Sequence, residues 1–232
     1  SSSEQKQKEY YNRIAQEYDD HYASPGAIAY RRNLFHRLLK PEQIKGINAL
    51  DACCGGGENS AILAEMGAQL TGLDISEKQC EIYQKRLPQA KVLCASLAEV
   101  PLSNAEFDLT ITESLHHLHP HTGEAVQELL RLTKPGGALV LWEPSAGSFL
   151  DVIRKVWYRL DRRYFEDNEA SIDFQKLRRY WQDTATVESI TYGGNVGFLL
   201  VMSSMHFRIP PSWVAKYAPL LMKLDQWIEP WQ

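Results

Sequence analysis

The sequence lacks long apolar runs, an excess of one charge and a signal-peptide core, and each absence excludes a class of protein. No apolar stretch approaches the ~20 residues that a membrane-spanning helix needs. The net charge of −4 provides no basic field that would attract nucleic acid or an anionic membrane. The first ten residues have no apolar core, and their serines are typical of a disordered tail or a cloning remnant. We therefore expect a cytoplasmic protein with no membrane span and no nucleic-acid partner.

Cysteine is also scarce. The four cysteines, Cys53, Cys54, Cys80 and Cys94, form no CxxC pair, and three of them lie in or beside apolar segments. Disulfide frameworks and zinc sites normally show regular cysteine spacing. The pattern predicts buried free thiols in a reducing compartment and no bound metal.

A glycine-rich stretch stands out from the rest of the chain. Residues 48–53 form a short apolar run with one acid, which is typical of a strand buried in a parallel sheet. Three glycines follow at 55–57, where the chain must turn sharply and a ligand can approach the backbone. Residues 60–66 predict a helix and residues 69–73 a second strand, with Asp74 at its carboxyl end. A carboxylate in that place can accept hydrogen bonds from both ribose hydroxyls, so this stretch predicts a nucleoside-cofactor site.

Strands and helices alternate along the first two thirds of the chain. The further elements predicted from periodicity, caps and breakers are helices at residues 6–22, 25–40, 77–87 and 122–133 and strands at 91–94, 107–112 and 138–142. Alternation of this kind gives right-handed parallel crossovers and a doubly wound α/β sheet, and 44% hydrophobic content over 232 residues suffices for one such domain. Ligands of these sheets bind outside the carboxyl ends of the strands. We therefore expect the glycine turn, Asp74, Ser96 and residues 113–117 to meet at one edge.

The last third of the chain is rich in apolar and aromatic residues. Two helical stripes are predicted, formed by Leu150, Ile153, Trp157 and Leu160 and by Phe174, Leu177 and Trp181. Residues 186–192 predict a sixth strand, whereas 198–207 fit either a strand or an apolar helix. A C-terminal amphipathic helix would place Leu220, Leu221, Leu224 and Trp227 on one side, to close a pocket, to form a dimer face or to touch a membrane, in that order. The aromatic supply favours a flat or hydrophobic small molecule as partner.

Five segments in register resemble the class I S-adenosylmethionine-dependent methyltransferases, close to their quinone-biosynthesis and small-molecule group. "ALDACCGGG" is similar to the family's "LDxGCGTG" turn, and "TGLDIS" to the acid at the end of its second strand. "EVPLSNAEFDLTITESLHHL" resembles "LPFPDxSFDxV…LHHL", and "LTKPGGALVLWEP" resembles "LKPGGxLxxxE". "YYNRIAQEYDDHY" resembles the tyrosine-bearing entry helix "YFDxxAxxYD". The resemblance covers about residues 7 to 145.

The resemblance implies a Rossmann-like sheet with helices on both faces and a helical cap over the acceptor pocket. It divides one overall domain into lid helices at residues 1–45, a cofactor-binding core at 46–144, a substrate cap at 145–185, and last strands with a C-terminal helix at 186–232. The cofactor would be S-adenosyl-L-methionine and the product S-adenosyl-L-homocysteine. The residues implied to bind the cofactor are Tyr11, Tyr18, Asp51, Ala52, Cys53, Gly55, Asp74, Ile75, Gln79, Ser96, Leu97, Glu113 and Ser114.

Two positions depart from the family pattern. Cys53 occupies the place of the first glycine of the turn, which puts a side chain where bare backbone usually passes. Ser96 occupies the place of the acid that usually accepts from the adenine amino group. Both departures predict altered cofactor contacts. They leave open a protein of this fold that binds the cofactor without transferring methyl.

The histidine-rich segment 116–121 suggests a metal cluster, but the family commonly carries "LHH" here without one. His116 or His117 would either remove a proton from the acceptor or position it, because the pKa of histidine lies near neutrality. In-line methyl transfer also gains much of its rate from positioning alone, so a base is optional.

We predict methyl transfer to a small aromatic or apolar acceptor, most readily at oxygen and then at nitrogen or carbon, by a monomer or homodimer. A nicotinamide-dependent oxidoreductase is the less favoured alternative, because Ser60 stands where the dinucleotide fingerprint has its third glycine.

Overall fold

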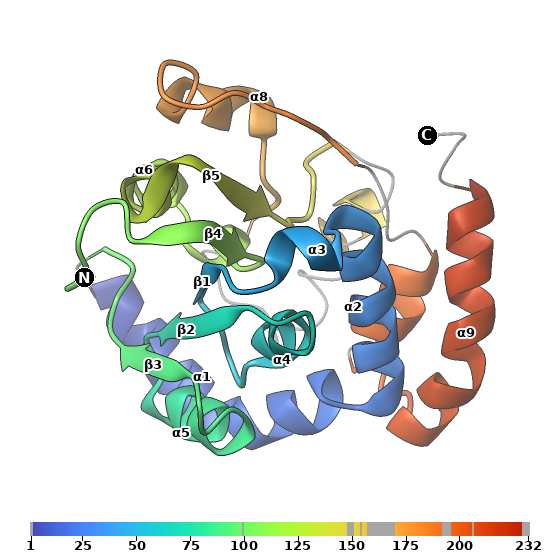
Figure 1. Cartoon of the computed structure of the whole chain (residues 1–232). Coiled ribbons are helices and arrows are strands. Elements are labelled where there is room, and N and C mark those ends of the chain that lie inside the picture. The colour runs from blue at the N-terminus through green and yellow to red at the C-terminus, as the bar shows by residue number, and fades with distance from the viewer. Residues whose placement is uncertain are drawn as a thin grey trace.

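A five-stranded parallel sheet forms the centre of the computed structural model (Figure 1). The structure describes residues 2–98, 100–147, 151–153, 155–156, 170–191, 196–205 and 207–228. The strand order is β3-β2-β1-β4-β5, with every neighbouring pair parallel. The strands are β1 (Asn48–Ala52), β2 (Gln69–Asp74), β3 (Lys91–Cys94), β4 (Phe107–Thr112) and β5 (Thr133–Leu141). The chain reverses direction across the sheet between β1 and β4, as in a doubly wound fold.

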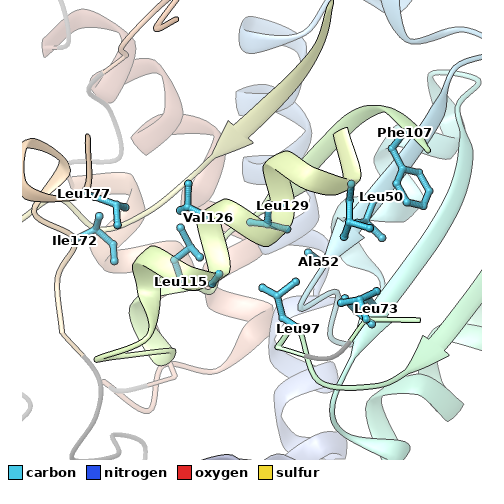
Figure 2. Close-up of a cluster of buried hydrophobic side chains, with 13 residues drawn as sticks. Leu50, Ala52, Leu73, Leu97, Phe107, Leu115, Val126, Leu129, Ile172 and Leu177 are labelled. Carbon is cyan, nitrogen blue, oxygen red and sulfur yellow. The ribbon is translucent and has the colours of Figure 1, made fainter. Parts of the chain in front are cut away.

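Helices cover both faces of this sheet, and the strands bury side chains in a core on each face. Leu50 and Phe107 belong to the core beneath α6 (Thr122–Leu132), which is drawn in Figure 2. Ala49 and Leu109 belong to the opposite core, which contains side chains of α2 (Pro25–Leu38), α3 (Pro41–Ile44) and α4 (Glu58–Glu65). The predicted fold class is therefore confirmed.

The helix α1 (Ser2–Tyr22) runs along the edge at which the strands end. Its side chains bond to Ser76, Ser96 and His117, which follow β2, β3 and β4 respectively. It also packs on α5 (Glu77–Arg86).

The N-terminal caps explain where two helices begin. Ser76 accepts a hydrogen bond from the Gln79 N–H through its side chain and so caps α5. Ser24 precedes Pro25 at the start of α2, but its side chain makes no capping bond. Within α2, Phe35 is buried whereas Leu38 is 39% exposed.

A third core joins α2 to the C-terminal part of the chain. Ala27 and Tyr30 of α2 pack on the π-helical turn η3 (Phe198–Met202) and on α9 (Pro211–Ile228). Figure 1 shows α9 lying alongside α2. Residues 198–202 are thus helical, which resolves the alternative between strand and helix.

Most of the apolar side predicted for α9 points away from the protein, whereas Leu221 packs against the third core. Leu220 is 68% exposed and Trp227 is 71% exposed, while Val214 and Ala218 are buried against α2. The expectation that Leu220 and Trp227 close a pocket is wrong for the part of the chain that the structure describes. Small side chains allow close approach to α2, which decides the orientation of the helix.

The region after β5 differs from its prediction in several places. The strand begins at Thr133 rather than 138 and includes the "KPGG" turn, with an irregular register between Phe107 and Leu109. Residues 185–191 form no strand, and Tyr192 lies outside the described residues. Leu150, Trp157 and Leu160 of the first predicted helical stripe also lie outside the described residues.

A short cap segment returns to the sheet. Ile172 pairs with the chain around Ser145, and the Ala170 N–H donates to the His116 carbonyl. Ile172 and Leu177, the latter in α8 (Phe174–Leu177), complete the core beneath α6 (Figure 2). The 3-10 turns are η1 (Leu115–His117) and η2 (Arg178–Tyr180). Within the described residues, the structure has no helix long and apolar enough to cross a membrane.

Candidate functional site

The glycine turn and the carboxylate of Asp74 form one hydrogen-bonded unit. The Gly55 N–H donates to Asp74 Oδ2 at 2.9 Å, and the Ser76 N–H donates to Oδ1 at 2.9 Å. Burial raises the pKa of Asp74, and the same two backbone donors oppose that rise. The carboxylate therefore lies at the carboxyl end of β2 with its orientation fixed, directly beside the turn.

Cys53 takes the backbone conformation that glycine would take. Its φ is +57°, and Gly55 (+53°) and Gly57 (+89°) share this left-handed region. A non-glycine residue there costs about 1–2 kcal/mol. The side chain turns toward Thr112 and packs against the core beneath α6, so it does not block the turn. The departure noted at Cys53 is thus a locally strained backbone, with the thiol on the side of the core.

Asp51 is almost completely buried at the end of β1. It accepts hydrogen bonds from the Ser60 N–H (3.1 Å) and the Ser60 hydroxyl (2.8 Å), and the Tyr83 hydroxyl donates to Ser60 at 3.0 Å. Burial raises the pKa of Asp51 to about 8 despite these donors. The carboxyl therefore holds the first turn of α4 against β1 and α5, and it holds a proton at neutral pH.

The replacement Asp51→Asn is expected to flatten the pH dependence of stability. Between roughly pH 4 and 8 the folded protein keeps a proton that the unfolded chain releases, so the free energy of unfolding falls as pH rises, by up to about 1.4 kcal/mol per pH unit. Above the folded-state pKa of about 8 the loss is complete. Chemical denaturation at pH 5 and pH 8 measures the slope.

Asp108→Asn provides the control for this experiment. A hydrogen bond from Lys134 lowers the pKa of Asp108, so its contribution changes only at more acidic pH. This variant should keep the wild-type difference between pH 5 and pH 8. An unchanged difference in Asp51→Asn would contradict the raised pKa.

Arg31 of α2 is a buried cation above the end of β4. Its Nη1 donates to Glu113 (2.5 Å) and to Asn59 (2.7 Å), and its guanidinium lies 5.3 Å from the Tyr22 ring centroid and 5.6 Å from that of Trp142. Burial alone would lower the pKa of Arg31, but the Glu113 carboxylate raises it above its ordinary value. In the same way burial acts to raise the pKa of Glu113 and Arg31 lowers it. Both groups are therefore charged, and the pair fixes Glu113.

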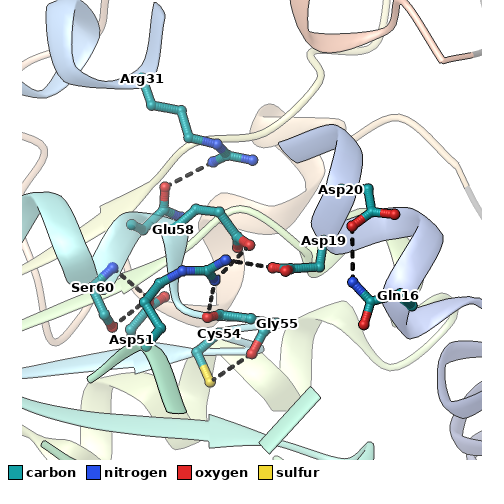
Figure 3. Close-up of polar contacts among 12 residues, drawn as sticks. Gln16, Asp19, Asp20, Arg31, Asp51, Cys54, Gly55, Glu58 and Ser60 are labelled. Carbon is teal, nitrogen blue, oxygen red and sulfur yellow. Dashed lines mark hydrogen bonds and ion pairs between the residues drawn. The ribbon is translucent and has the colours of Figure 1, made fainter. Parts of the chain in front are cut away.

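A second arginine, Arg86, connects α1 to the glycine turn. Arg86 donates to Asp19 of α1 (2.5 Å), to Glu58 (2.9 Å) and to the Gly56 carbonyl. Figure 3 shows Asp19 of α1 opposite Glu58 and Gly55 of the turn. A Cβ on Gly56 would lie 2.8 Å from both Arg86 and Asp19, so the absence of a side chain there permits the contact.

The tyrosines of α1 form an aromatic row that ends at His117. The rings of Tyr11 and Tyr18 meet edge to face at 5.8 Å, and those of Tyr18 and Tyr22 lie 4.8 Å apart. The Tyr11 hydroxyl lies 3.1 Å from His117 Nδ1, and Gln7 donates to the His117 carbonyl. His117 thus contacts α1 through both its ring and its carbonyl.

His116 instead contacts a buried carboxyl just after β5, that of Glu143. Its Nδ1 lies 2.8 Å from Glu143 Oε2, and the backbone N–H of Leu115 donates to Oε1 at 2.7 Å. The side chain of Glu143 is 0% exposed, and that of His116 is 17% exposed. Burial raises the pKa of Glu143 to about 8. The pair can therefore share and move one proton near neutral pH.

At the end of β3, Ser96 contacts the lid helix. Its hydroxyl donates to the carboxylate of Glu4 and accepts from the Ala98 N–H at 3.1 Å. Gln79 of α5 is buried, and among the residues that the structure describes its Oε1 has no hydrogen-bond partner. This oxygen can accept a hydrogen bond from a water or from a bound molecule.

Tyr11 and Tyr18 lie in α1, and the other predicted cofactor residues lie at or after the carboxyl ends of β1 to β4 or in α5. Leu97 is buried in the core beneath α6. The cofactor-binding roles of all these residues stay predictions. Sequence reasoning missed Glu143, although the quoted "KPGG" segment contains it.

Other residues that contact the predicted site residues could not be recognised from the local sequence. Arg31, Asn59, Arg86 and Glu4 come from helices far along the chain from the groups they bind. Among the described residues no group of three or more His, Cys, Asp or Glu side chains is arranged to hold a metal ion. The four cysteines are free thiols; Cys54 and Cys80 are buried as predicted, whereas Cys94 is exposed.

Several known proteins of similar sequence or structure are methyltransferases. Residues 49–137 match a family model described as a methyltransferase domain. The chain is 29% identical over 153 residues to the malonyl-[acyl-carrier protein] O-methyltransferase of Pseudescherichia vulneris, covering 66% of this chain and 59% of that protein. It is 26% identical over 180 residues to the demethylmenaquinone methyltransferase of Lysinibacillus sphaericus, covering 68% of this chain and 75% of that protein.

Among solved structures, magnesium protoporphyrin IX methyltransferase from Synechocystis with bound S-adenosylhomocysteine has a TM-score of 0.64 at 19% identity. The match covers 82% of this chain and 92% of that chain, and it shows the likeness of fold. The chain spans between 41% and 59% of the length of three curated relatives that it matches.

Proposed function

Because residues 49–137 belong to the methyltransferase domain family and the fold is that of class I S-adenosylmethionine-dependent methyltransferases, we propose that this chain transfers a methyl group from S-adenosylmethionine to a small acceptor. The observation that carries the proposal is the fixed Asp74 carboxylate beside the glycine turn, under a lid helix lined by tyrosines. These are the groups that a ribose and a cationic sulfonium need.

The residues present fit this cofactor. Asp74 would bind the ribose hydroxyls, and the backbone at residues 52–55 would pass against the methionine part. Tyr11 and Tyr18 would cover the sulfonium with aromatic faces, because a cation over such a face is stabilised. The buried, unpartnered Oε1 of Gln79 offers an acceptor for a donor on the base. When bound, the cofactor supplies the electrophilic methyl group.

We assign the acceptor side to the ends of β4 and β5, where His116 and Glu143 meet. A hydroxyl acceptor would lose its proton to His116 as its oxygen takes the methyl group from sulfur, and S-adenosylhomocysteine would leave. The ring of Trp142 lies beside Arg31 near the same edge and favours a flat or apolar acceptor. Phenolic or quinol oxygen is therefore the first choice, ahead of nitrogen and carbon. His117, engaged with Tyr11, would position the lid rather than move a proton.

A methyl-transfer assay tests this function. The protein is incubated with S-adenosylmethionine labelled in its methyl group and with a panel of acceptors: a substituted phenol, a reduced naphthoquinone, a malonyl thioester and an aromatic amine. We expect label in an oxygen-methylated product and equal formation of S-adenosylhomocysteine.

Calorimetric titration with S-adenosylhomocysteine serves as the parallel measurement of binding. Binding without label transfer to any member of the panel would contradict the enzyme proposal. It would favour the alternative, a protein of this fold that only binds the cofactor.

A further inference from the structure

We propose that Glu4, from the lid helix α1, accepts a hydrogen bond from the adenine amino group. The family pattern has an acid with this role at the position of Ser96. This inference rests on the proposed cofactor site. It assigns a binding role to a residue outside the core of the fold. It also makes recognition of the base depend on the lid.

The order of the strands places the base. Asp74 ends β2, the glycine turn follows β1 on one side, and β3 lies on the other side. If the methionine part runs over the turn, then the base must extend from the ribose toward the end of β3. The Ala95 N–H donates to the Asp74 carbonyl at 3.0 Å, so the residues after β3 lie immediately beside the ribose carboxylate. Ser96 therefore borders the space that the base would occupy.

The hydroxyl of Ser96 is not itself suited to accept from the base. It has one proton, which it donates to Glu4, and one of its lone pairs already accepts from the Ala98 N–H. The serine thus orients the Glu4 carboxylate, whose oxygens have room for several donors. An amino group that arrives beside Ser96 finds a charged acceptor, and such hydrogen bonds are the strong ones.

The lid helix is fixed in a way that keeps Glu4 in this place. Farther along α1, Asn12 accepts from the Ser76 hydroxyl at 2.7 Å and Asp19 binds Arg86 at 2.5 Å. These contacts anchor the helix to the ends of β2 and α5, so the position of Glu4 follows from the closed lid. Because this carboxylate lies on the lid helix and not on the sheet, lid closure and recognition of the base depend on each other.

The test compares two ligands that differ only at the group in question. S-Adenosylhomocysteine carries a 6-amino donor, and S-inosylhomocysteine carries a 6-oxo acceptor at the same position. Calorimetry should show that the wild type prefers S-adenosylhomocysteine by roughly 10-fold or more, as expected for one hydrogen bond to a charged group. In Glu4→Gln the preference should fall to within about 3-fold, because the amide can donate to the oxo group as well as accept.

Two further variants make the result specific. Glu9→Gln lies on the same helix, where Glu9 bonds only to Gln5 among the contacts described, and it should keep the wild-type preference. In Glu4→Ala with Ser96→Asp the acid returns to the sheet, and the preference should return toward the wild-type value.

The outcomes separate this inference from the proposed function. If the wild type binds neither ligand, the cofactor proposal itself is wrong. If it binds S-adenosylhomocysteine and Glu4→Gln retains the full preference, the assignment of Glu4 is overturned while the cofactor site stands. A preference that is lost in Gln79→Leu but kept in Glu4→Gln would likewise overturn it, with Gln79 as the acceptor.

Discussion

Replacement of Asp74 by alanine is expected to weaken S-adenosylhomocysteine binding by about 2–5 kcal/mol, the value of one to two hydrogen bonds to a charged group. The structure adds a second reason for a large effect. Asp74 also accepts from the Gly55 and Ser76 backbone N–H groups, so its loss removes ligand contacts and loosens the turn together. Isothermal calorimetry measures the affinity, and the free energy of unfolding of the variant reports the loosened turn.

Asp74→Asn separates the two contributions. The amide keeps the shape of the side chain and one acceptor, so it should preserve more of the turn than alanine does while still losing charge toward the ribose. Asp108→Ala, at the opposite end of the sheet, is the control and should bind like the wild type, because Asp108 contacts only Asn48 and Lys134 among the bonds described. An Asp74→Ala variant with unchanged affinity would remove the ribose assignment.

The second large effect is expected at His116. If His116 removes the acceptor's proton, His116→Ala should lower kcat by about 10²–10⁴-fold. His117→Ala is the matched neighbour: because His117 bonds to the lid, it should raise KM more than it lowers kcat. Steady-state rates with the acceptor identified in the labelling assay measure both. Equal, small effects of the two variants would mean that positioning alone supplies the rate.

Glu143 gives this prediction a pH dependence with a definite sign. When Glu143 is protonated it donates to His116 Nδ1, the ring proton lies on Nε2, and that nitrogen cannot act as a base. Since burial raises the pKa of Glu143 to about 8, kcat should increase as pH rises through about 8. In Glu143→Gln the Leu115 N–H should hold the amide oxygen, which turns the amide nitrogen toward Nδ1. That variant should be slow at every pH, and a wild-type pH profile in it would exclude the pair.

Much of the fold could be predicted because its signals are local. Alternating apolar strands, the three-glycine turn and the Ser76 cap each act through neighbouring residues, and they located β1 to β4, α4 and α5 to within a few residues. The carboxyl edge followed from the parallel order of the strands. The predicted cofactor residues of the core were therefore assigned to this edge from the sequence, and their roles stay predictions.

Predictions failed where local periodicity competed with tertiary packing. Residues 185–191 alternate like a strand but have no strand beside them in the described structure. In α9 the larger apolar side is exposed, because Val214 and Ala218 fit closely against α2 and form the contact instead. Hydrophobicity alone does not report which face of a helix finds a surface of matching shape.

The sequence by itself determined the sheet, the glycine turn and the carboxylate at its edge, since these depend on short-range sterics and periodicity. Only the tertiary structure decided which side chains meet there: Arg31 with Glu113, Glu143 with His116, and Glu4 with Ser96. Each pair joins residues from separate elements, and their contact depends on how helices and strands are stacked. Cys53 illustrates both contributions. The sequence pattern showed that a cysteine in this turn is unusual, and only the tertiary structure showed that its thiol packs against the core.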